Sequence, residues 1–213
     1  MVAHTNDVNF MMTLIDYGVG NIQAFENIYK KLNIPVQIAK TAEDLTRASK
    51  LILPGVGSFD WAMSRLNGSG MRPALDELVI NSRCPVLGIC VGMQMLADSS
   101  EEGELPGLGW IAGEVKRFNF DACAHKIDLP HMGWNDVLPN KVNGLFSGLE
   151  VSRFYFLHSY YFLSNESNNV LAKTDYGNLF ASSVCLDNIF GVQFHPEKSH
   201  RWGIRLLKNF SEL

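Results

Sequence analysis

A cysteine with glycines on either side, at the end of a short apolar run, constrains this sequence more than any other feature. The run covers residues 86–89, and Gly88, Cys90 and Gly92 indicate a buried strand that turns sharply into a helix. Such a turn needs residues with little or no side chain beside the central one, which is held in a strained, exposed conformation. We expect the backbone N–H groups and the dipole of the following helix to stabilise a thiolate on Cys90.

The first half of the chain alternates strand and helix patterns. Strand patterns cover residues 10–17, 35–39, 51–53 and 86–89, and helix patterns cover residues 22–32, 59–66 and 73–80. Asn21 is a candidate N-cap for the first helix, and Thr41 with Asp44 resembles a capping box that begins a further short helix. Repeated β-α-β units predict a mostly parallel sheet with helices on both faces, a flavodoxin-like three-layer α/β/α fold.

The second half contains mainly strand patterns. They cover residues 108–118, 153–162, 170–174, 180–186 and 189–194. Asp187 and Asn188 predict a hairpin between the last two, so antiparallel strands are added to the parallel core. Residues 199–210 predict an amphipathic helix with Ile204, Leu207 and Phe210 on its apolar face. Without repeats or linkers, residues 10–213 are expected to form one domain, preceded by an N-terminal extension at residues 1–9.

Composition excludes several classes of function. The chain has 213 residues, 19% of them charged, and a net charge of −4 without a basic run, so a nucleic-acid partner has no electrostatic support. A signal pattern and a membrane-length apolar run are both missing, which predicts a cytoplasmic protein without a membrane partner. The four cysteines form no C-x-x-C pair and are expected to be free thiols; they are Cys84, Cys90, Cys123 and Cys185. The six histidines show no ligand spacing, so neither a metal nor a cofactor is predicted.

A second chemical motif lies far downstream of Cys90. His195 and Glu197 are two residues apart, and in an extended segment both side chains would project to the same side, so that Glu197 orients His195. A cysteine, a base and an orienting acid indicate nucleophilic catalysis on an acyl or amide carbon. The loop with Gly55 and Gly57, together with the N–H of Val91, would form an oxyanion hole. Alternatively, these glycines only make a sharp turn.

These motifs resemble those of a known family. Residues 88–94 and 194–197 are similar to the corresponding motifs of class I (triad-type) glutamine amidotransferases. Within that class, further segments resemble the glutaminase subunits of imidazole glycerol phosphate synthase; they are residues 16–21, 54–57, 130–135, 155–160 and 206–210. The resemblance covers nearly the whole chain except about the first nine residues, and the combination of motifs is highly specific.

The resemblance implies that Cys90 attacks the side-chain amide of glutamine, that His195 protonates the departing ammonia, and that water then hydrolyses the glutamyl thioester. It assigns the oxyanion hole to Gly55, Val56 and Val91. It assigns glutamine contacts to Gly57, Gln94, Glu102, His158, Ser159 and Tyr160. Glu101 adjoins Glu102, so a shift of one residue would exchange the two.

The resemblance also implies a partner in a heterodimer. This is a (β/α)8-barrel cyclase subunit that receives ammonia through a channel and makes imidazole glycerol phosphate and AICAR in histidine biosynthesis. The strip facing it would comprise His131, Met132, Gly133, Trp134 and Asn135. In this turn-like segment, Trp134 is either an interface anchor or a core residue.

Three other functions compete with this one. A paralogous amidotransferase would supply ammonia to a synthase-like partner that modifies a surface sugar, and nothing in a glutaminase subunit reports the final acceptor. Intracellular cysteine peptidases and deglycase-like proteins have similar cysteine turns but lack a late His-Pro-Glu segment. An inactive regulatory subunit would need a lost triad member, whereas Cys90, His195 and Glu197 are all present.

Overall fold

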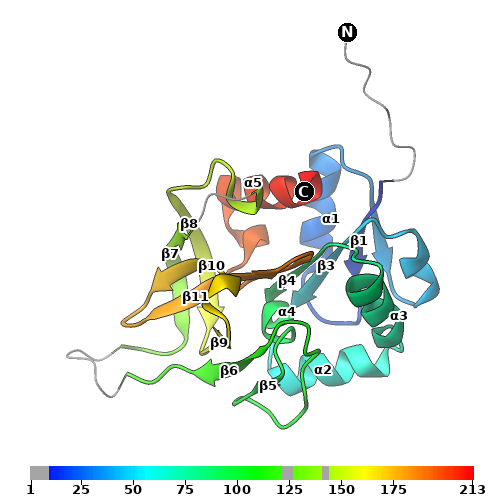
Figure 1. Ribbon diagram of the computed structural model, residues 1–213. Helices are drawn as coiled ribbons and strands as arrows, with labels where there is room; N and C mark the ends of the chain where they lie inside the picture. Colours follow the sequence, from blue (N-terminus) through cyan, green and yellow to red (C-terminus); the bar gives the residue numbers. More distant parts are fainter. Residues whose placement is uncertain (1–9, 121–126, 141–143) are drawn as a thin grey trace.

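The central layer of the molecule is a parallel sheet. A computed structural model describes residues 10–120, 127–140 and 144–213, so the predicted extension at residues 1–9 and Cys123 lie outside the described residues (Figure 1). The parallel strands are, in spatial order, β2 (Val36–Ala39), β1 (Met12–Ile15), β3 (Lys50–Gly55), β4 (Val86–Cys90) and β12 (Ile189–Val192). The carboxyl ends of β3, β4 and β12 therefore meet at one edge, where ligands of parallel sheets gather.

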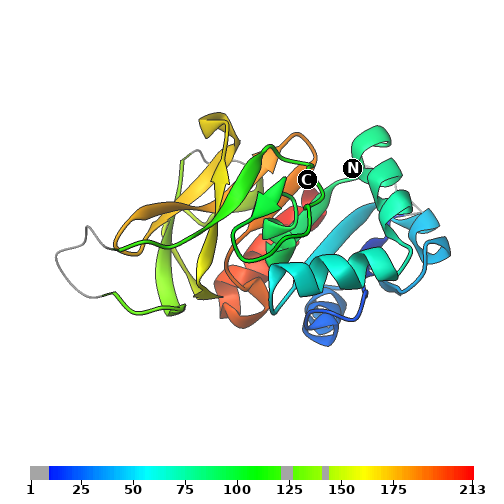
Figure 2. The ribbon, with the colours of Figure 1, turned by 90° about the horizontal axis from the view of Figure 1, so that it is seen from below.

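Helices cover both faces of this sheet, which confirms the predicted three layers (Figures 1 and 2). One face carries α1 (Ile22–Lys31) and α5 (His200–Glu212), and the other carries α2 (Phe59–Gly68), α3 (Arg72–Asp76) and α4 (Val91–Gln94). The predicted cap of α1 is confirmed, because Oδ1 of Asn21 accepts the N–H of Ala24. Phe25 and Tyr29 of α1 are buried, and Lys30 lies in its last turn, where a cation favours the helix dipole.

Antiparallel strands extend the sheet beyond β12. In the described residues they are β11 (Leu179–Leu186), β10 (Val170–Asp175), β7 (His131–Pro139) and β8 (Ser152–His158). From β11 branches β9 (Tyr160–Ser164), which pairs antiparallel with β6 (Gly113–Arg117), and β6 pairs parallel with β5 (Ser99–Ser100). The predicted hairpin is confirmed: β11 and β12 pair antiparallel, with Leu186 opposite Ile189. Asp187 in its turn has a φ of +51°, the left-handed region that Asp tolerates better than most residues.

Several predicted elements differ from the observed ones. The strand predicted at residues 108–118 is only β6, because residues 108–111 donate their N–H groups to carbonyls just after α4 and form a loop there. The strand predicted at 153–162 is two strands, since the chain changes partner at Ser159, from β7 to β6 and β11. In α5 the side chain of Ile204 is 41% exposed, and Leu206 is buried beside Leu207 and Phe210 instead.

The short helical segments also depart from regular α-helix. The capping-box helix is the 3-10 turn η1 (Glu43–Arg47), with Oδ2 of Asp44 accepting the N–H of Thr41. The helix predicted at 73–80 continues from α3 as a π-helical turn, η2 (Glu77–Asn81). Three further 3-10 turns are η3 (Gly144–Phe146), η4 (Ser167–Asn169) and η5 (Pro196–Lys198). In short helical segments such as these, tertiary contacts can override the local helical spacing of the sequence.

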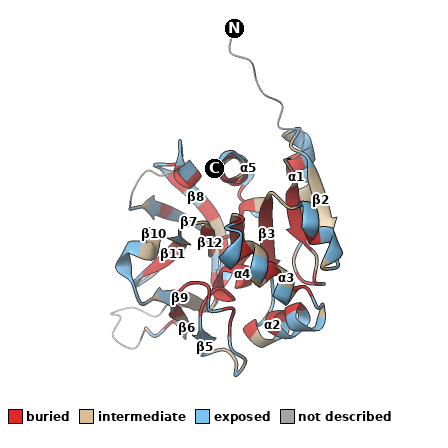
Figure 3. Cartoon of the chain, turned by 45° about the vertical axis from the view of Figure 1, so that its right-hand side comes forward, coloured by how far each residue is buried: buried red, intermediate tan, exposed pale blue. Residues whose placement is uncertain are grey.

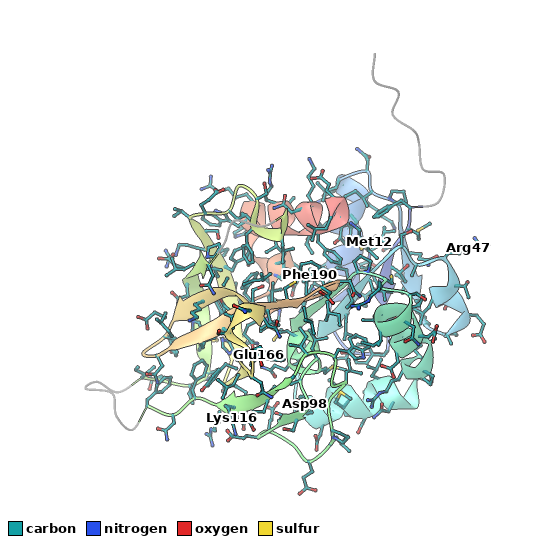
Figure 4. The ribbon with its side chains drawn as sticks, in the orientation of Figure 1. Met12, Arg47, Asp98, Lys116, Glu166 and Phe190 are labelled. Atoms are coloured by element: carbon teal, nitrogen blue, oxygen red, sulfur yellow. The ribbon has the colours of Figure 1, made fainter. Side chains whose placement is uncertain are left out.

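The core lies between the sheet and its helices, where β1, β3, β4 and β12 are almost entirely buried, whereas β2 at the edge is mostly half-buried (Figure 3). The side chains fill the space between the layers, including Met12 on β1 and the half-buried Phe190 on β12 (Figure 4). The rings of Phe154 and Phe194 stack with centroids 3.9 Å apart, which attaches β8 to the end of β12. Among the described residues, no helix combines the length and apolar character needed to cross a membrane.

Candidate active site

Cys90 lies in a sharp turn between β4 and α4, as the sequence predicts. Its φ of +56° and ψ of −113° place a non-glycine residue in a strained backbone conformation. A Cβ on Gly88 would lie 2.6 Å from the carbonyl oxygen of Gly92, and one on Gly92 would collide with the carbonyl oxygen of Leu53. The turn therefore requires both glycines.

A helix follows this turn, as the sequence predicts, but it is short. α4 spans only Val91–Gln94, a single turn, so its dipole is small. Gly55 pairs with Cys90 across β3 and β4, which brings the Pro-Gly-Val-Gly loop to the same edge. A Cβ on Gly55 would collide with the backbone nitrogen of Gly92, so this glycine allows the two loops to approach closely.

His195 follows β12, the strand next to β4, and its ring pairs with Glu197. Nδ1 of His195 lies 2.9 Å from Oε1 of Glu197, and both side chains are buried. The expectation of an extended segment is wrong, because η5 begins at Pro196 and its turn, rather than strand alternation, brings Glu197 back to His195. The backbone is fixed on both sides: His195 donates its N–H to Tyr155, and the Ser199 hydroxyl donates to the His195 carbonyl.

The charge of His195 is set by its two neighbours. Burial alone would lower the pKa of the imidazole, but hydrogen bonds to Cys90 and Glu197 and their negative charges raise this pKa to about 10. Because Nδ1 faces the carboxylate, Nε2 is the nitrogen left for Cys90. The arrangement suits an imidazolium between a thiolate and a carboxylate.

A cavity of about 450 Å³ opens at Cys90 and His195, a volume suited to a small polar substrate. Its walls contain every residue for which the resemblance implies a glutamine contact: Gly57, Gln94, Glu102, His158, Ser159 and Tyr160. Val56 and Val91 line it as well, whereas Gly55 is buried and is not part of the lining. Pro130, Leu157 and Lys198 complete the cavity, and sequence reasoning did not identify them.

The two adjacent glutamates have different positions. Glu102 faces the cavity, and its Oε2 accepts the N–H of Phe59 at the start of α2 over 2.8 Å. Burial raises the pKa of Glu102, the Phe59 N–H opposes this, and Asp60 adds to it. Glu101 instead accepts the N–H of Arg117 and pairs with Lys116 outside the cavity. The labelled Lys116 lies on β6 in Figure 4.

Gln193 is a buried polar residue of the site that the sequence interpretation missed. Its Nε2 lies 3.9 Å from Sγ of Cys90, and its Oε1 lies 3.0 Å from Nε2 of Gln94. The available signal was a glutamine two positions before His195 in an otherwise apolar run. In the described part of the chain, no three His, Cys, Asp or Glu residues are placed to hold a metal ion.

The predicted partner strip is a strand rather than a turn-like segment. It begins β7, whose residues alternate between the two faces of the β7–β8 ribbon. Met132 is 65% exposed and Trp134 is 37% exposed, so Trp134 is not a core residue. His131 is only 2% exposed, which contradicts its predicted place on a partner-facing surface. Gly133 and Asn135 are half-buried.

A strained cysteine at the carboxyl edge of a three-layer α/β/α sheet, with a buried His-Glu pair beside it, is the arrangement typical of enzymes with a cysteine nucleophile. A family model described as Glutamine amidotransferase class-I matches residues 13–212, and the chain belongs to that family.

Curated relatives give a finer comparison. Over 204 residues the chain is 58% identical to the imidazole glycerol phosphate synthase subunit HisH of Bdellovibrio bacteriovorus, covering 95% of this chain and 100% of the relative. It is 53% identical to the protein of the same name from Leptospira interrogans, with the same coverage of both chains.

Solved structures share the fold at low sequence identity. A glutamine amidotransferase from Thermotoga maritima has a TM-score of 0.62 and 18% identity, covering 96% of this chain and 83% of that one. PurLQS from Thermotoga maritima has a TM-score of 0.71 and 13% identity, covering 95% and 97%. These likenesses support the flavodoxin-like architecture.

Proposed function

We propose that this chain is the glutaminase subunit of an imidazole glycerol phosphate synthase. It hydrolyses glutamine to glutamate and ammonia, and the ammonia passes to a cyclase subunit in histidine biosynthesis. The observation that carries the proposal is the meeting of Cys90 and His195 at one cavity, with Glu197 bonded to Nδ1 of His195 behind it. The names of the curated relatives support this acceptor over a sugar-modifying partner.

The first half of the reaction acylates Cys90. The Cys90 thiolate attacks the side-chain amide carbon of glutamine, and the carbonyl oxygen becomes an oxyanion. Backbone groups of Gly55, Val56 and Val91 are proposed to stabilise this charge, as the resemblance implies. The imidazolium of His195 gives its Nε2 proton to the amide nitrogen, the C–N bond breaks, and ammonia leaves a γ-glutamyl thioester on Cys90.

The second half releases glutamate. His195 is now neutral and takes a proton from water, and the oxygen of that water attacks the thioester carbon. The C–S bond breaks, glutamate leaves, and the thiolate and imidazolium are restored. Glu197 contacts Nδ1 throughout, so it keeps the ring oriented with Nε2 toward the reacting atoms.

Polar groups of the cavity are proposed to select glutamine. The Glu102 carboxylate suits the α-ammonium group of the substrate. Its Oε2 accepts the N–H of Phe59, so its Oε1 is the oxygen proposed to bind the ammonium group. Gly57, Gln94, Ser159 and Tyr160 are proposed to surround the rest of the substrate, with His158 in the same wall. The side-chain amide would then lie at Cys90.

Released ammonia needs a protected route, because water would protonate it and remove its nucleophilicity. We propose that the exposed face of the β7–β8 ribbon binds the (β/α)8-barrel cyclase subunit in a cytoplasmic heterodimer. Met132 lies opposite Leu157, which is 39% exposed, and Trp134 lies opposite Tyr155. Exposed Met and Trp side chains side by side are typical of interface centres.

The direct test compares wild-type chain with Cys90→Ser, each mixed with the cyclase subunit from the same organism. We expect wild type to produce glutamate, and to support formation of imidazole glycerol phosphate from glutamine, whereas Cys90→Ser supports neither. With ammonium salts in place of glutamine, the complex containing Cys90→Ser should still make the product. Glutamate release by Cys90→Ser would refute the nucleophile, and a complex that fails with both nitrogen sources would refute the partner.

A further inference from the structure

We propose that Gln193 is a hydrogen-bond donor to the Cys90 thiolate, held in that direction by Gln94 and the carbonyl of Tyr160. This role rests on the proposed use of Cys90 as the nucleophile. Gln193 follows the last residue of β12 and is completely buried between β12 and the turn at Cys90. It touches the reacting sulfur, so it would act as a catalytic residue rather than a packing residue.

The direction of the Gln193 amide follows from one unambiguous acceptor. A backbone carbonyl can only accept, and the carbonyl of Tyr160 lies 3.0 Å from the amide nitrogen of Gln94. The second hydrogen on that nitrogen then points to Gln193, 3.0 Å away, which makes the facing atom of Gln193 its oxygen. The remaining group of the Gln193 amide, its NH2, is the one that faces Sγ of Cys90.

The same carbonyl also fixes a second branch of the network. It accepts from Nδ1 of His158 over 2.8 Å, so Nε2 of His158 must accept from Nδ1 of His131 over 3.0 Å. Nε2 of His131 then accepts from the amide of Asn135, whose nitrogen also donates to the carbonyl of Asp175. Each of these donors has an acceptor in a single consistent direction. Reversing the Gln193 amide would place its oxygen against Sγ of Cys90 and its nitrogen against the amide nitrogen of Gln94, which has no free acceptor site.

The sulfur needs such a donor when it is charged. As a thiol, Cys90 can donate to the carbonyl of Leu157, 4.0 Å from Sγ, but a thiolate gains nothing from that oxygen. The N–H of Gln193 at 3.9 Å is long for a neutral contact, and we expect it to shorten when the sulfur is ionised. With His195 as the first donor, Gln193 provides the second.

Titratable groups around Cys90 come from several elements. His195 precedes η5, and Tyr17, in the loop after β1, donates its hydroxyl to the carbonyl of Pro54. Glu102 and Lys198 line the cavity, and Glu197 lies behind His195. Substituting Gln193 by an uncharged residue leaves all these groups in place, so a change in the ionisation of Cys90 reports the lost donor.

The experiment measures alkylation of Cys90 by iodoacetamide as a function of pH, using the full chain and peptide mass spectrometry to count each cysteine separately. Gln193→Met keeps the volume and removes the donor, and we expect alkylation of Cys90 at neutral pH to slow about tenfold. Gln193→Glu places an acceptor against the sulfur and should slow it further. The rate at Cys185, far from the cavity in the hairpin strand β11, serves as an internal reference.

A matched control removes a buried amide elsewhere. Asn209 in α5 donates to the carbonyls of Leu145 and Ser147, so Asn209→Leu should lower stability without changing alkylation of Cys90. Unchanged alkylation in folded Gln193→Met would overturn the proposal. If the variants do not fold, NMR of the wild-type protein tests the proposal instead. The side-chain amide signals of Gln193 must then shift as Cys90 ionises, and unshifted signals would overturn the proposal. Neither readout needs glutamine turnover or a partner. A failure of this proposal can therefore be distinguished from a failure of the proposed function.

Discussion

Glu197 interacts with His195 through one carboxylate oxygen, and the proposed mechanism has it hold the ring for both proton transfers. We expect Glu197→Gln to lower kcat for glutamine hydrolysis on the order of 100-fold, because the amide cannot stabilise the imidazolium by charge. The binding of glutamine should change little, since Glu197 lies outside the cavity wall. Steady-state kinetics of the complex with its partner measures both effects. Glu166→Gln, at an exposed loop, is the control, and an equal loss there would contradict the assignment.

Two buried histidines predict acid sensitivity of the fold. Burial lowers the pKa of His131 to about 4 and that of His158 to about 3, so both are neutral in the folded chain at pH 7. The unfolded chain binds their protons near pH 6.5, so the free energy of unfolding falls as pH decreases below that value. Each histidine contributes a slope of about 1.4 kcal/mol per pH unit.

Urea unfolding of wild type and His131→Asn between pH 6.5 and 5 tests this expectation. The variant is less stable overall, but its stability should depend less steeply on pH, because one buried histidine is gone. His200→Asn, at an exposed position, should keep the wild-type slope. Equal slopes in wild type and His131→Asn would show that His131 is not kept neutral by burial.

At the scale of elements, α5 packs closely on η5, the turn that follows His195, the proposed catalytic base. A Cβ on Gly203 of α5 would collide with the carbonyl oxygen of Pro196, so no other residue allows this approach. We expect Gly203→Ala to displace η5 from Cys90 and to reduce glutaminase activity at least tenfold while the sheet stays folded. Gly68→Ala in α2 is the matched control, since a Cβ there meets nothing within 4 Å. Glutaminase activity is measured for both variants, and circular dichroism spectra check that each is folded. Equal activities in the two folded variants would contradict the claim.

Elements fixed by local signals were predictable from the sequence. Asn21, the turn at Asp187 and the glycines around Cys90 each satisfy a requirement of a few neighbouring residues, and the structure confirms them. The break at Ser159 was not predictable, because it depends on which distant strand each half joins. Trp134 was ambiguous for the same reason, since the side chain's exposure depends on which face of β7 it occupies.

The site shows the same division. The sequence motifs allowed Cys90, His195 and Glu197 to be proposed, and the structure brings them close together, but the turn that joins the last two was not predictable. The proposed role of Gln193 depends on contacts with Cys90 and Gln94 and on the carbonyl of Tyr160, and no spacing in the sequence predicts that these groups meet.

At the scale of the whole molecule, β8 contributes both to the exposed ribbon face and to the cavity wall, since Leu157 is 39% exposed and also lines the cavity. We expect Trp134→Ala to weaken the binding of the cyclase partner about tenfold or more, because a half-exposed tryptophan beside Met132 is a typical interface anchor. Calorimetric titration measures the affinity. Ile80→Ala removes an exposed apolar side chain of η2, which follows α3, and should leave the affinity unchanged. Figure 1 shows α3 at the end of the molecule opposite β7 and β8. Equal affinities of wild type and Trp134→Ala would place the interface elsewhere.

The central claim is that Cys90 carries a γ-glutamyl thioester during turnover. Acid-quenching the complex during glutamine hydrolysis, followed by peptide mass spectrometry, tests it most directly. We predict an adduct with the mass of a glutamyl group on the peptide containing Cys90, and its absence in Cys90→Ser. Continued release of glutamate by Cys90→Ser, or an adduct on a different cysteine that follows turnover, would contradict the account.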